Sequence, residues 1–112
     1  MPSDDVFDAL GDPTRRRLLV LLTHGGPSTA TALAEQLSIS RQAVAKHLDQ
    51  LRSAGVARVE RVGREARYEV VPERLDHAAA WLTARAREWD GRLDRIRREL
   101  ERRVGDTERG TR

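Results

Sequence analysis

The spacing of apolar residues changes twice along this 112-residue chain, and this change constrains the fold more than any other feature. Up to residue 54, apolar residues recur every three or four positions, which is typical of helices that pack through one face. Over residues 56–71, apolar and polar residues alternate around a short loop containing Gly63, which indicates a β-hairpin. Helical spacing returns after Pro72. The predicted fold class is mainly α with a small β-hairpin, in the order α-α-α-α-β-β-α.

Turn and capping residues divide the first half of the chain into four helices. Gly and Pro interrupt the helical pattern at residues 25–27, and Gly55 stands where a helix commonly ends in a left-handed residue. The predicted helices cover residues 5–11, 13–24, 30–37 and 40–54. The tight connection at 38–40 makes the last two a helix-turn-helix. With the hairpin that follows, the arrangement predicts a winged helix-turn-helix, whose second paired helix enters the DNA major groove.

The helix predicted over 40–54 has an apolar face and a polar face. Val44, Leu48 and Leu51 are spaced by four and three residues, so they face the core. The opposite face offers an amide that can pair with adenine, cations that reach guanine or phosphate, and a small residue that permits close approach. The residues of this helix predicted to bind DNA are Ser40, Arg41, Gln42, Ala45, Lys46 and His47. His47 also has a second interpretation, packing at the edge of the core.

The middle of the chain carries a basic surface. Residues 40–71 hold seven basic groups against four acidic ones, which is the charge balance expected of a polyanion-binding surface. Within the hairpin, Arg64 at the tip and Arg67 are predicted to contact phosphate or the minor groove. Arg58 and Arg61 lie in the same hairpin. In an alternative interpretation, these arginines do not bind DNA but keep the exposed edge of the hairpin from pairing with other molecules, and this alternative stays open.

The last predicted helix, residues 73–103, has an unbroken heptad pattern. Its seam residues are Leu75, Ala79, Leu82, Ala86, Trp89, Leu93, Ile96 and Leu100. A single small domain has too little apolar surface to cover such a seam, so we expect a homodimer. The alternative is that the helix folds back on its own domain. A two-fold dimer would face an inverted repeat of double-stranded DNA with recognition helices ~34–36 Å apart. The single domain is predicted over 5–103, and residues 104–112 are predicted to form a disordered tail.

Four stretches of this sequence resemble the ArsR/SmtB family of bacterial winged-helix repressors. They are FDALGDPTRR at 7–16, LAEQLSISRQAVAKHL at 33–48, LRSAGV at 51–56 and the hairpin segment GREARY at 63–68. The resemblance extends over residues 5–100. It implies an autoregulatory repressor that occupies a promoter as a homodimer.

Metal-binding members of that family use residues that this chain lacks. The chain has no cysteine, whereas many members bind metal through cysteines in the helix that corresponds to 29–37. Other members bind zinc through carboxylates and histidines spaced farther apart than Asp76 and His77, which are adjacent here with no later histidine. The chain therefore resembles a subgroup without the metal-binding cysteines, and we expect neither a metal nor another cofactor.

Other function classes find little support in the residues. There is no Gly-rich phosphate loop, thiol nucleophile, Ser–His–Asp set or paired carboxylates, so an enzyme is not expected. No apolar run approaches the ~18 residues of a membrane span. The acidic, polar start at 1–5 does not resemble a secretory signal, so we expect a cytoplasmic protein. A metal- or small-ligand-sensing repressor and a winged-helix protein-interaction module remain alternatives, and no residue pattern identifies an effector.

Overall fold

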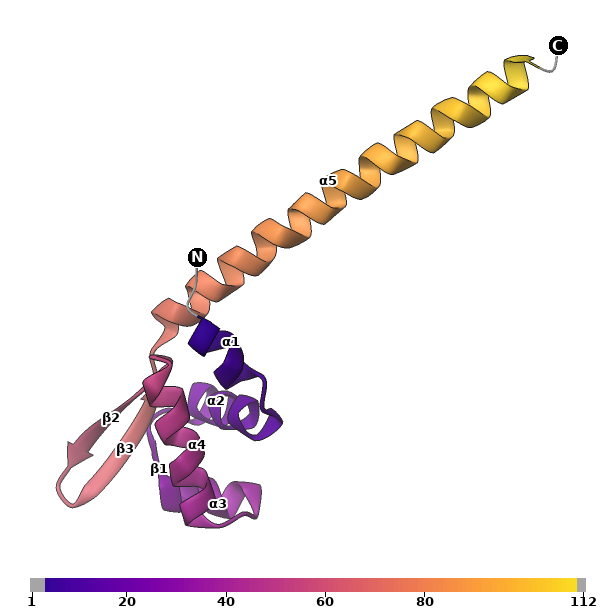
Figure 1. The fold of residues 1–112 in the computed structure, drawn as a ribbon. Coiled ribbons are helices and arrows are strands. Elements are labelled where there is room, and N and C mark those ends of the chain that lie inside the picture. Colours follow the sequence, from indigo (N-terminus) through magenta and orange to yellow (C-terminus); the bar gives the residue numbers. More distant parts are fainter. Residues whose placement is uncertain (1–3, 111–112) are drawn as a thin grey trace. The chain divides into compact units, whose positions relative to one another are not determined.

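The computed structural model describes residues 4–110 as five helices and three strands (Figure 1). These residues divide into two units, a domain that ends at Ala79 and a helical segment that begins at Ala80. The elements are α1 (Asp4–Leu10), α2 (Pro13–Gly25), β1 (Ser28–Thr29), α3 (Ala30–Leu37), α4 (Arg41–Ser53), β2 (Ala57–Val62), β3 (Glu65–Val70) and α5 (Pro72–Gly110).

The predicted fold class is confirmed, with one addition to the sheet. The helices and the hairpin follow the predicted order, and β2 pairs antiparallel with β3 from Ala57 opposite Val70 to Val62 opposite Glu65. The sequence analysis missed β1, which pairs antiparallel with β3 and makes a sheet of order β1-β3-β2. A two-residue strand is too short to show a period-two pattern, so its sequence gave no signal.

The turn between α3 and α4 is fixed by its backbone and by a side-chain cap. Ser38 has a left-handed φ of 57°, and its backbone N–H donates to the carbonyl of Ala34, which closes the end of α3. The Ser40 hydroxyl oxygen then accepts a hydrogen bond of 3.1 Å from the backbone N–H of Ala43, and α4 begins at Arg41. This cap satisfies one of the otherwise unpaired amides at the start of α4.

The core of the domain is aliphatic, as the low aromatic content of the chain requires. Val44, Leu48 and Leu51 of α4 are fully buried, which confirms the predicted inward face of this helix. The core also includes residues from every other helix of the domain and from the first turns of α5, where Ala78 is buried and Leu75 packs partly against it. Leu75, the first residue of the predicted dimer seam, therefore contributes to the domain core.

Beyond Ala80, α5 is a long helix with exposed apolar side chains. It continues to Gly110, so the predicted end at Arg103 was wrong, and residues 104–110 are helical where a disordered tail was predicted. Residues 111–112 lie outside the described residues. A glycine within a helix costs only about 1 kcal/mol, so Gly105 does not end α5 by itself. Ion pairs of Glu99 with Arg102 and Arg103 support the helix just before that point.

Over residues 4–110, the structure contains no helix that combines the length and the apolar character needed to cross a membrane.

Candidate nucleic-acid interface

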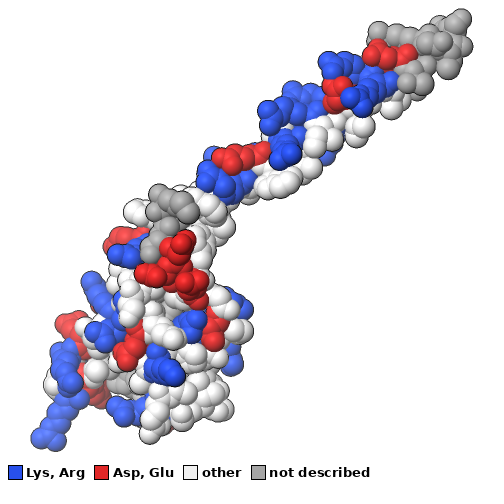
Figure 2. Space-filling model, viewed as in Figure 1, with Lys and Arg blue, Asp and Glu red and all other residues white. Residues whose placement is uncertain are grey.

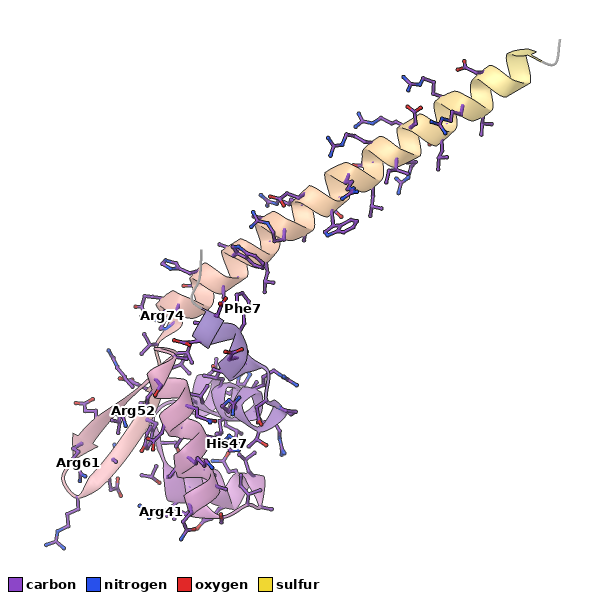
Figure 3. The ribbon with its side chains drawn as sticks, viewed as in Figure 1. Phe7, Arg41, His47, Arg52, Arg61 and Arg74 are labelled. Atoms are coloured by element: carbon purple, nitrogen blue, oxygen red, sulfur yellow. The ribbon has the colours of Figure 1, made fainter. Side chains whose placement is uncertain are left out.

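The outer face of α4 presents polar side chains whose bonding groups are unoccupied. Arg41, Gln42 and Lys46 are exposed, and within residues 4–110 none of them has a hydrogen bond or an ion pair. Figure 3 shows Arg41 at the N-terminal end of α4, directed away from the body of the domain. Ala45 lies between them and is half-buried. Three free polar side chains around a small residue can approach a flat, polar partner closely.

One acidic residue interrupts this face. Asp49 forms an exposed ion pair of 3.4 Å with Arg52, one turn along the same helix. The pair reduces the local negative charge that Asp49 would otherwise present beside Lys46 and Ala45. The N-terminal half of α4 is consequently the basic half, and it coincides with the positive end of the helix dipole.

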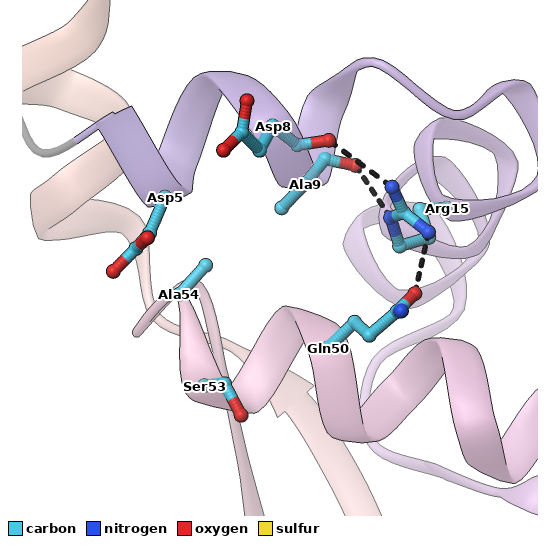
Figure 4. Close-up of a pocket in the computed structure, with 7 residues that line it drawn as sticks. All are labelled: Asp5, Asp8, Ala9, Arg15, Gln50, Ser53 and Ala54. Atoms are coloured by element: carbon cyan, nitrogen blue, oxygen red, sulfur yellow. Dashed lines mark hydrogen bonds between the residues drawn. The ribbon is translucent and has the colours of Figure 1, made fainter.

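Arg15 of α2 contacts α1 and one side of α4 (Figure 4). Its Nε donates 2.7 Å to the carbonyl of Ala9 and its Nη2 donates 3.1 Å to the carbonyl of Asp8. Its Nη1 donates to Oε1 of Gln50 on α4 and lies 3.4 Å from Nδ1 of His47. Arg15 thus joins α1, α2 and α4, and it holds α4 along the side that carries His47 and Gln50.

This position separates His47 from the other residues predicted to bind DNA. The side chain is half-buried and lies toward Arg15, whereas Gln42 and Lys46 are exposed on the outer face. The DNA contact of His47 stays a prediction. The partners of Arg15 on α4, His47 and Gln50, lie 32 and 35 residues away in the sequence, so only the folded chain reveals this contact.

A pocket of ≈ 260 Å³ opens beside Arg15, between α1 and the C-terminal end of α4. Figure 4 shows its lining side chains, which include the carboxylates of Asp5 and Asp8. Within residues 4–110, no three His, Cys, Asp or Glu side chains are grouped closely enough to hold a metal ion.

The N-terminal cap of α2 places a carboxylate next to the Arg15 cluster. Asp12 Oδ1 accepts hydrogen bonds from the backbone N–H groups of Thr14 at 2.8 Å and Arg15 at 3.1 Å. These bonds favour the ionised carboxylate, above all the one from Arg15, and they lower the pKa of Asp12 below its ordinary value. The start of α2, and with it the position of Arg15, therefore depends on an ionised Asp12.

The hairpin divides its four arginines into paired and free ones. Arg58 donates to Glu69 across the two strands, and Arg67 forms an ion pair of 3.1 Å with Glu65. Arg61 on β2 and Arg64 at the tip have neither a hydrogen bond nor an ion pair within the described residues. Figure 2 shows basic side chains projecting from the free end of the hairpin.

These pairings determine which arginines of the hairpin are available to bind an external anion. Arg67 shares its charge with Glu65, so it offers less to an external anion than the sequence suggested. Arg61, for which the sequence analysis above predicts no DNA contact, has a free charge within the described residues. Glu65 and Arg67 lie two residues apart on β3, so their ion pair is local. The pairing of Arg58 with Glu69 depends on the register between β2 and β3. Gly63, with a φ of 64°, provides the left-handed residue that the tip before Arg64 requires.

A helix pair joined by a tight turn, a second helix with a free polar outer face and a hairpin with a basic tip together define a winged helix-turn-helix. The comparisons with known proteins agree with this class. Residues 10–60 match a family described as a helix-turn-helix domain. The transcriptional repressor SdpR of Bacillus subtilis (strain 168) is 37% identical over 79 residues, which are 70% of this chain and 87% of that protein.

Solved structures show the same fold over most of the chain. An ArsR-like transcriptional regulator from Rhodococcus sp. RHA1 has a TM-score of 0.79 and 40% sequence identity, and the match covers 88% of this chain and 89% of that one. The homodimeric winged helix-turn-helix DNA-binding domain Mb0332 of Mycobacterium bovis has a TM-score of 0.62 and 25% identity, covering 76% of this chain and 78% of that one. This chain belongs to the ArsR family of winged helix-turn-helix transcriptional regulators, and its relatives are regulators rather than enzymes.

Proposed function

We propose that this regulator is a homodimeric repressor that binds an inverted repeat in double-stranded DNA, with α4 in the major groove and the hairpin on the flanking backbone. The observation that carries the proposal is the outer face of α4, where Arg41, Gln42 and Lys46 are exposed and free of partners among the described residues. A protein-interaction module would instead need an acidic or apolar surface on this helix.

The side chains of α4 suit the edges of base pairs in the major groove. The amide of Gln42 can form two hydrogen bonds with adenine, in which its nitrogen donates to N7 and its oxygen accepts from the N6 amino group. Arg41 and Lys46 can donate to guanine or to phosphate oxygens. Ala45 permits close approach and offers a methyl group to thymine. Ser40 and the first amides of α4 lie at the positive helix end, which favours a phosphate.

The hairpin suits the DNA backbone. Arg64 at the tip and Arg61 beside it carry charges that no described residue neutralises. A free guanidinium on a projecting turn can bind phosphate or enter a narrow minor groove. Arg67 contributes less, since Glu65 competes for it. We therefore expect the hairpin to add affinity for DNA of any sequence, and α4 to add selectivity.

Dimerisation through α5 completes the proposal. The seam residues that follow Leu75 are exposed on a single chain: Ala79, Leu82, Ala86, Trp89, Leu93, Ile96 and Leu100. Large apolar side chains in a continuous row on a helix are typical of a surface that a partner covers. The homodimeric state described for Mb0332 and the repressor activity named for SdpR support a dimer that blocks transcription.

A DNA titration tests this function. Purified protein is titrated against fragments from upstream of its own gene and against random DNA of equal length, at two salt concentrations. We expect one fragment to bind selectively with two chains per site, and to retain selectivity at the higher salt concentration. Equal binding to all fragments that disappears with added salt would contradict the proposal, because it would reveal a basic surface without sequence recognition.

A further inference from the structure

The outer side of α2 carries an apolar side chain that none of the surfaces described above includes. Val20 is 53% exposed, although its neighbours Leu18 and Leu19 are buried in the core. It lies outside α4, the hairpin and the seam of α5. A β-branched residue has a lower helix propensity than leucine or alanine, so helix formation by itself does not favour valine at this exposed position.

Val20 forms part of the wall of a groove between α2 and the end of α3. The groove has a volume of ≈ 380 Å³, larger than the ≈ 260 Å³ pocket beside Arg15. Its wall is mostly apolar and includes Val20 and Leu21 of α2 and Leu37 of α3. Small-molecule sites commonly have volumes of ~300–1,000 Å³ and mostly apolar walls. The α2–α3 groove therefore has the size and the lining of a site for a small ligand with a hydrocarbon part.

Two arginines of α2 give the α2–α3 groove a positive charge. They are Arg16 and Arg17, and among the described residues none that lines the groove is acidic. Nη1 of Arg16 donates a hydrogen bond of 2.7 Å to the carbonyl of Leu10. Arg17 is exposed, and within residues 4–110 it has neither a hydrogen bond nor an ion pair. Arg17 is consequently the cation of the groove that is available to an anionic ligand.

The pocket beside Arg15 has a different charge balance. Asp5 and Asp8 line that pocket, and the guanidinium of Arg15 already donates to two backbone carbonyls and to Gln50. An anion would meet two carboxylates there and no free cation. Of the two cavities, the α2–α3 groove is therefore the one that suits an anion.

An apolar wall beside a free guanidinium suits an amphiphilic carboxylate. A guanidinium can donate two parallel hydrogen bonds to a carboxylate, and such charge-assisted bonds are stronger than those between neutral groups. A hydrocarbon chain or ring that covers Val20 and Leu21 gains about 25 cal/mol for each Å² of apolar surface removed from water. An alcohol with the same chain would keep the hydrophobic contribution and lose the ionic one.

The α2–α3 groove adjoins the turn that positions α4. Leu37, which lines the groove, is the last residue of α3. The backbone N–H groups of Ser38 and Ile39 donate to the carbonyl of Ala34 and close that helix, and Ser40 then caps α4. A ligand that displaces Leu37 therefore also moves the start of α4. A bound anion in addition offsets the charge of Arg17 and lowers the positive potential that attracts DNA.

We propose that the groove between α2 and α3 binds a small amphiphilic carboxylate, with the carboxylate on Arg17 and the hydrocarbon part on Val20 and Leu21, and that this ligand weakens DNA binding. The ligand site does not depend on DNA binding, whereas the effect on α4 rests on the proposed function.

An NMR titration of the backbone amides tests the site. Octanoate is the probe, and octan-1-ol, which has the same chain without the charge, is the control. We expect octanoate to shift the signals of α2 and of the end of α3, and to bind at least about fivefold more tightly than octan-1-ol. Equal affinity for both would contradict the role of Arg17. Shifts confined to α5 would place the ligand on the seam and overturn the site.

Charge reversal tests the cation of the groove. Arg17→Glu should raise the dissociation constant of octanoate about tenfold, because a carboxylate then faces the carboxylate of the ligand. The same variant should bind octylammonium more tightly than the unaltered protein does. Arg98→Glu, an equal charge change on α5, should alter neither affinity. Octanoate affinity that Arg17→Glu leaves unchanged would overturn the proposal.

A second variant tests the apolar wall. Val20→Asn removes the hydrocarbon contact at an exposed position, outside the core, and should raise the dissociation constant of octanoate about threefold. Val62→Asn replaces a valine of comparable exposure, 44%, in the hairpin and should leave octanoate binding unchanged. Equal effects of the two variants would contradict a contact with Val20.

Anisotropy titrations with DNA test the effect on α4. Saturating octanoate should raise the dissociation constant of the selected DNA fragment at least about fivefold, and bound DNA should raise that of octanoate by the same factor. Octan-1-ol should have no such effect, and Arg17→Glu should make DNA binding insensitive to the same concentration of octanoate. Unchanged DNA affinity with the groove occupied would overturn the effect on α4.

The outcomes separate this inference from the proposed function. If no DNA fragment binds selectively in the absence of octanoate, the proposed function fails, and the NMR titration still decides whether the groove binds a carboxylate. If selective DNA binding is found but octanoate does not bind between α2 and α3, the ligand site fails while the proposed function stands.

Discussion

The domain that ends at Ala79 and the helix that continues from Ala80 use the same residues in opposite ways. Leucine and other large apolar residues recur at helical spacing in both. In α4 they are fully buried, as for Leu48 and Leu51, whereas in α5 Trp89 and Leu93 leave half or more of their surface exposed. The difference lies in the neighbours: α4 packs against helices and strands of its own domain, and the described residues of the second unit form one helix. Spacing predicts an apolar face, but neighbours decide whether one chain or two must cover it.

The largest change that we expect is a loss of folding stability, and it should differ between the buried apolar face of α4 and the exposed seam of α5. Leu48→Ala removes a fully buried side chain from the domain core and should lower the free energy of unfolding by about 2–5 kcal/mol. Leu93→Ala removes the same atoms from the exposed seam and should leave the unfolding of the domain unchanged in dilute solution. Urea unfolding followed by circular dichroism measures both. Equal losses would mean that the single chain already buries its seam.

The second prediction concerns the free face of α4. Gln42→Ala should weaken binding to the selected DNA by about 1–3 kcal/mol and relax base choice at one position of each half-site. Gln36→Ala is the control, because Gln36 lies on α3 and bonds within its own helix. Anisotropy titrations against single-base variants of the bound fragment measure both changes. Unaltered affinity and selectivity would remove Gln42 from the interface.

The third prediction separates the hairpin from α4. Arg64→Ala should weaken binding to all DNA sequences about equally and reduce the slope of log affinity against log salt by ~0.9 per half-site. Arg98→Ala, which removes the same charge from the outer side of α5, should leave the slope unchanged. If both variants keep the slope of the unaltered protein, the tip does not contact phosphate.

The smallest effect comes from the cap that precedes Arg15. Because its hydrogen bonds lower the pKa of Asp12 in the folded chain, ionised Asp12 stabilises the fold above its unfolded pKa, and this contribution is lost as pH falls through the folded pKa. The stability cost of Asp12→Ala should therefore shrink between about pH 6 and about pH 3. Thr29→Ala removes the uncharged cap of α3 and should cost the same at both pH values. A pH-independent cost of Asp12→Ala would contradict the lowered pKa.

The sequence predicted the features that depend on local chemistry. Ser40, the first residue of the predicted helix 40–54, caps α4, and Gly55 has the left-handed φ of 78° expected at a helix end. The exposed face of α4 could be predicted because it lies opposite the apolar residues that the helical spacing assigns to the core. Each of these features depends on a few neighbouring residues, so a single sequence suffices to predict it.

The features that the sequence did not predict depend on distant residues or on small energy differences. The two-residue β1 exists because β3 lies beside it. The ion pair of Arg58 with Glu69 joins two strands, so it depends on their register. The continuation of α5 to Gly110 is set by modest helix propensities, which composition does not resolve.

In the proposed function, two copies of α4 read the two halves of an inverted repeat. Footprinting of the protein on the DNA upstream of its own gene tests it most directly. We expect two protected major-groove segments related by two-fold symmetry, separated centre to centre by one DNA turn of ~10 base pairs or a multiple of it. A single protected segment, or uniform weak protection without symmetry, would contradict the claim.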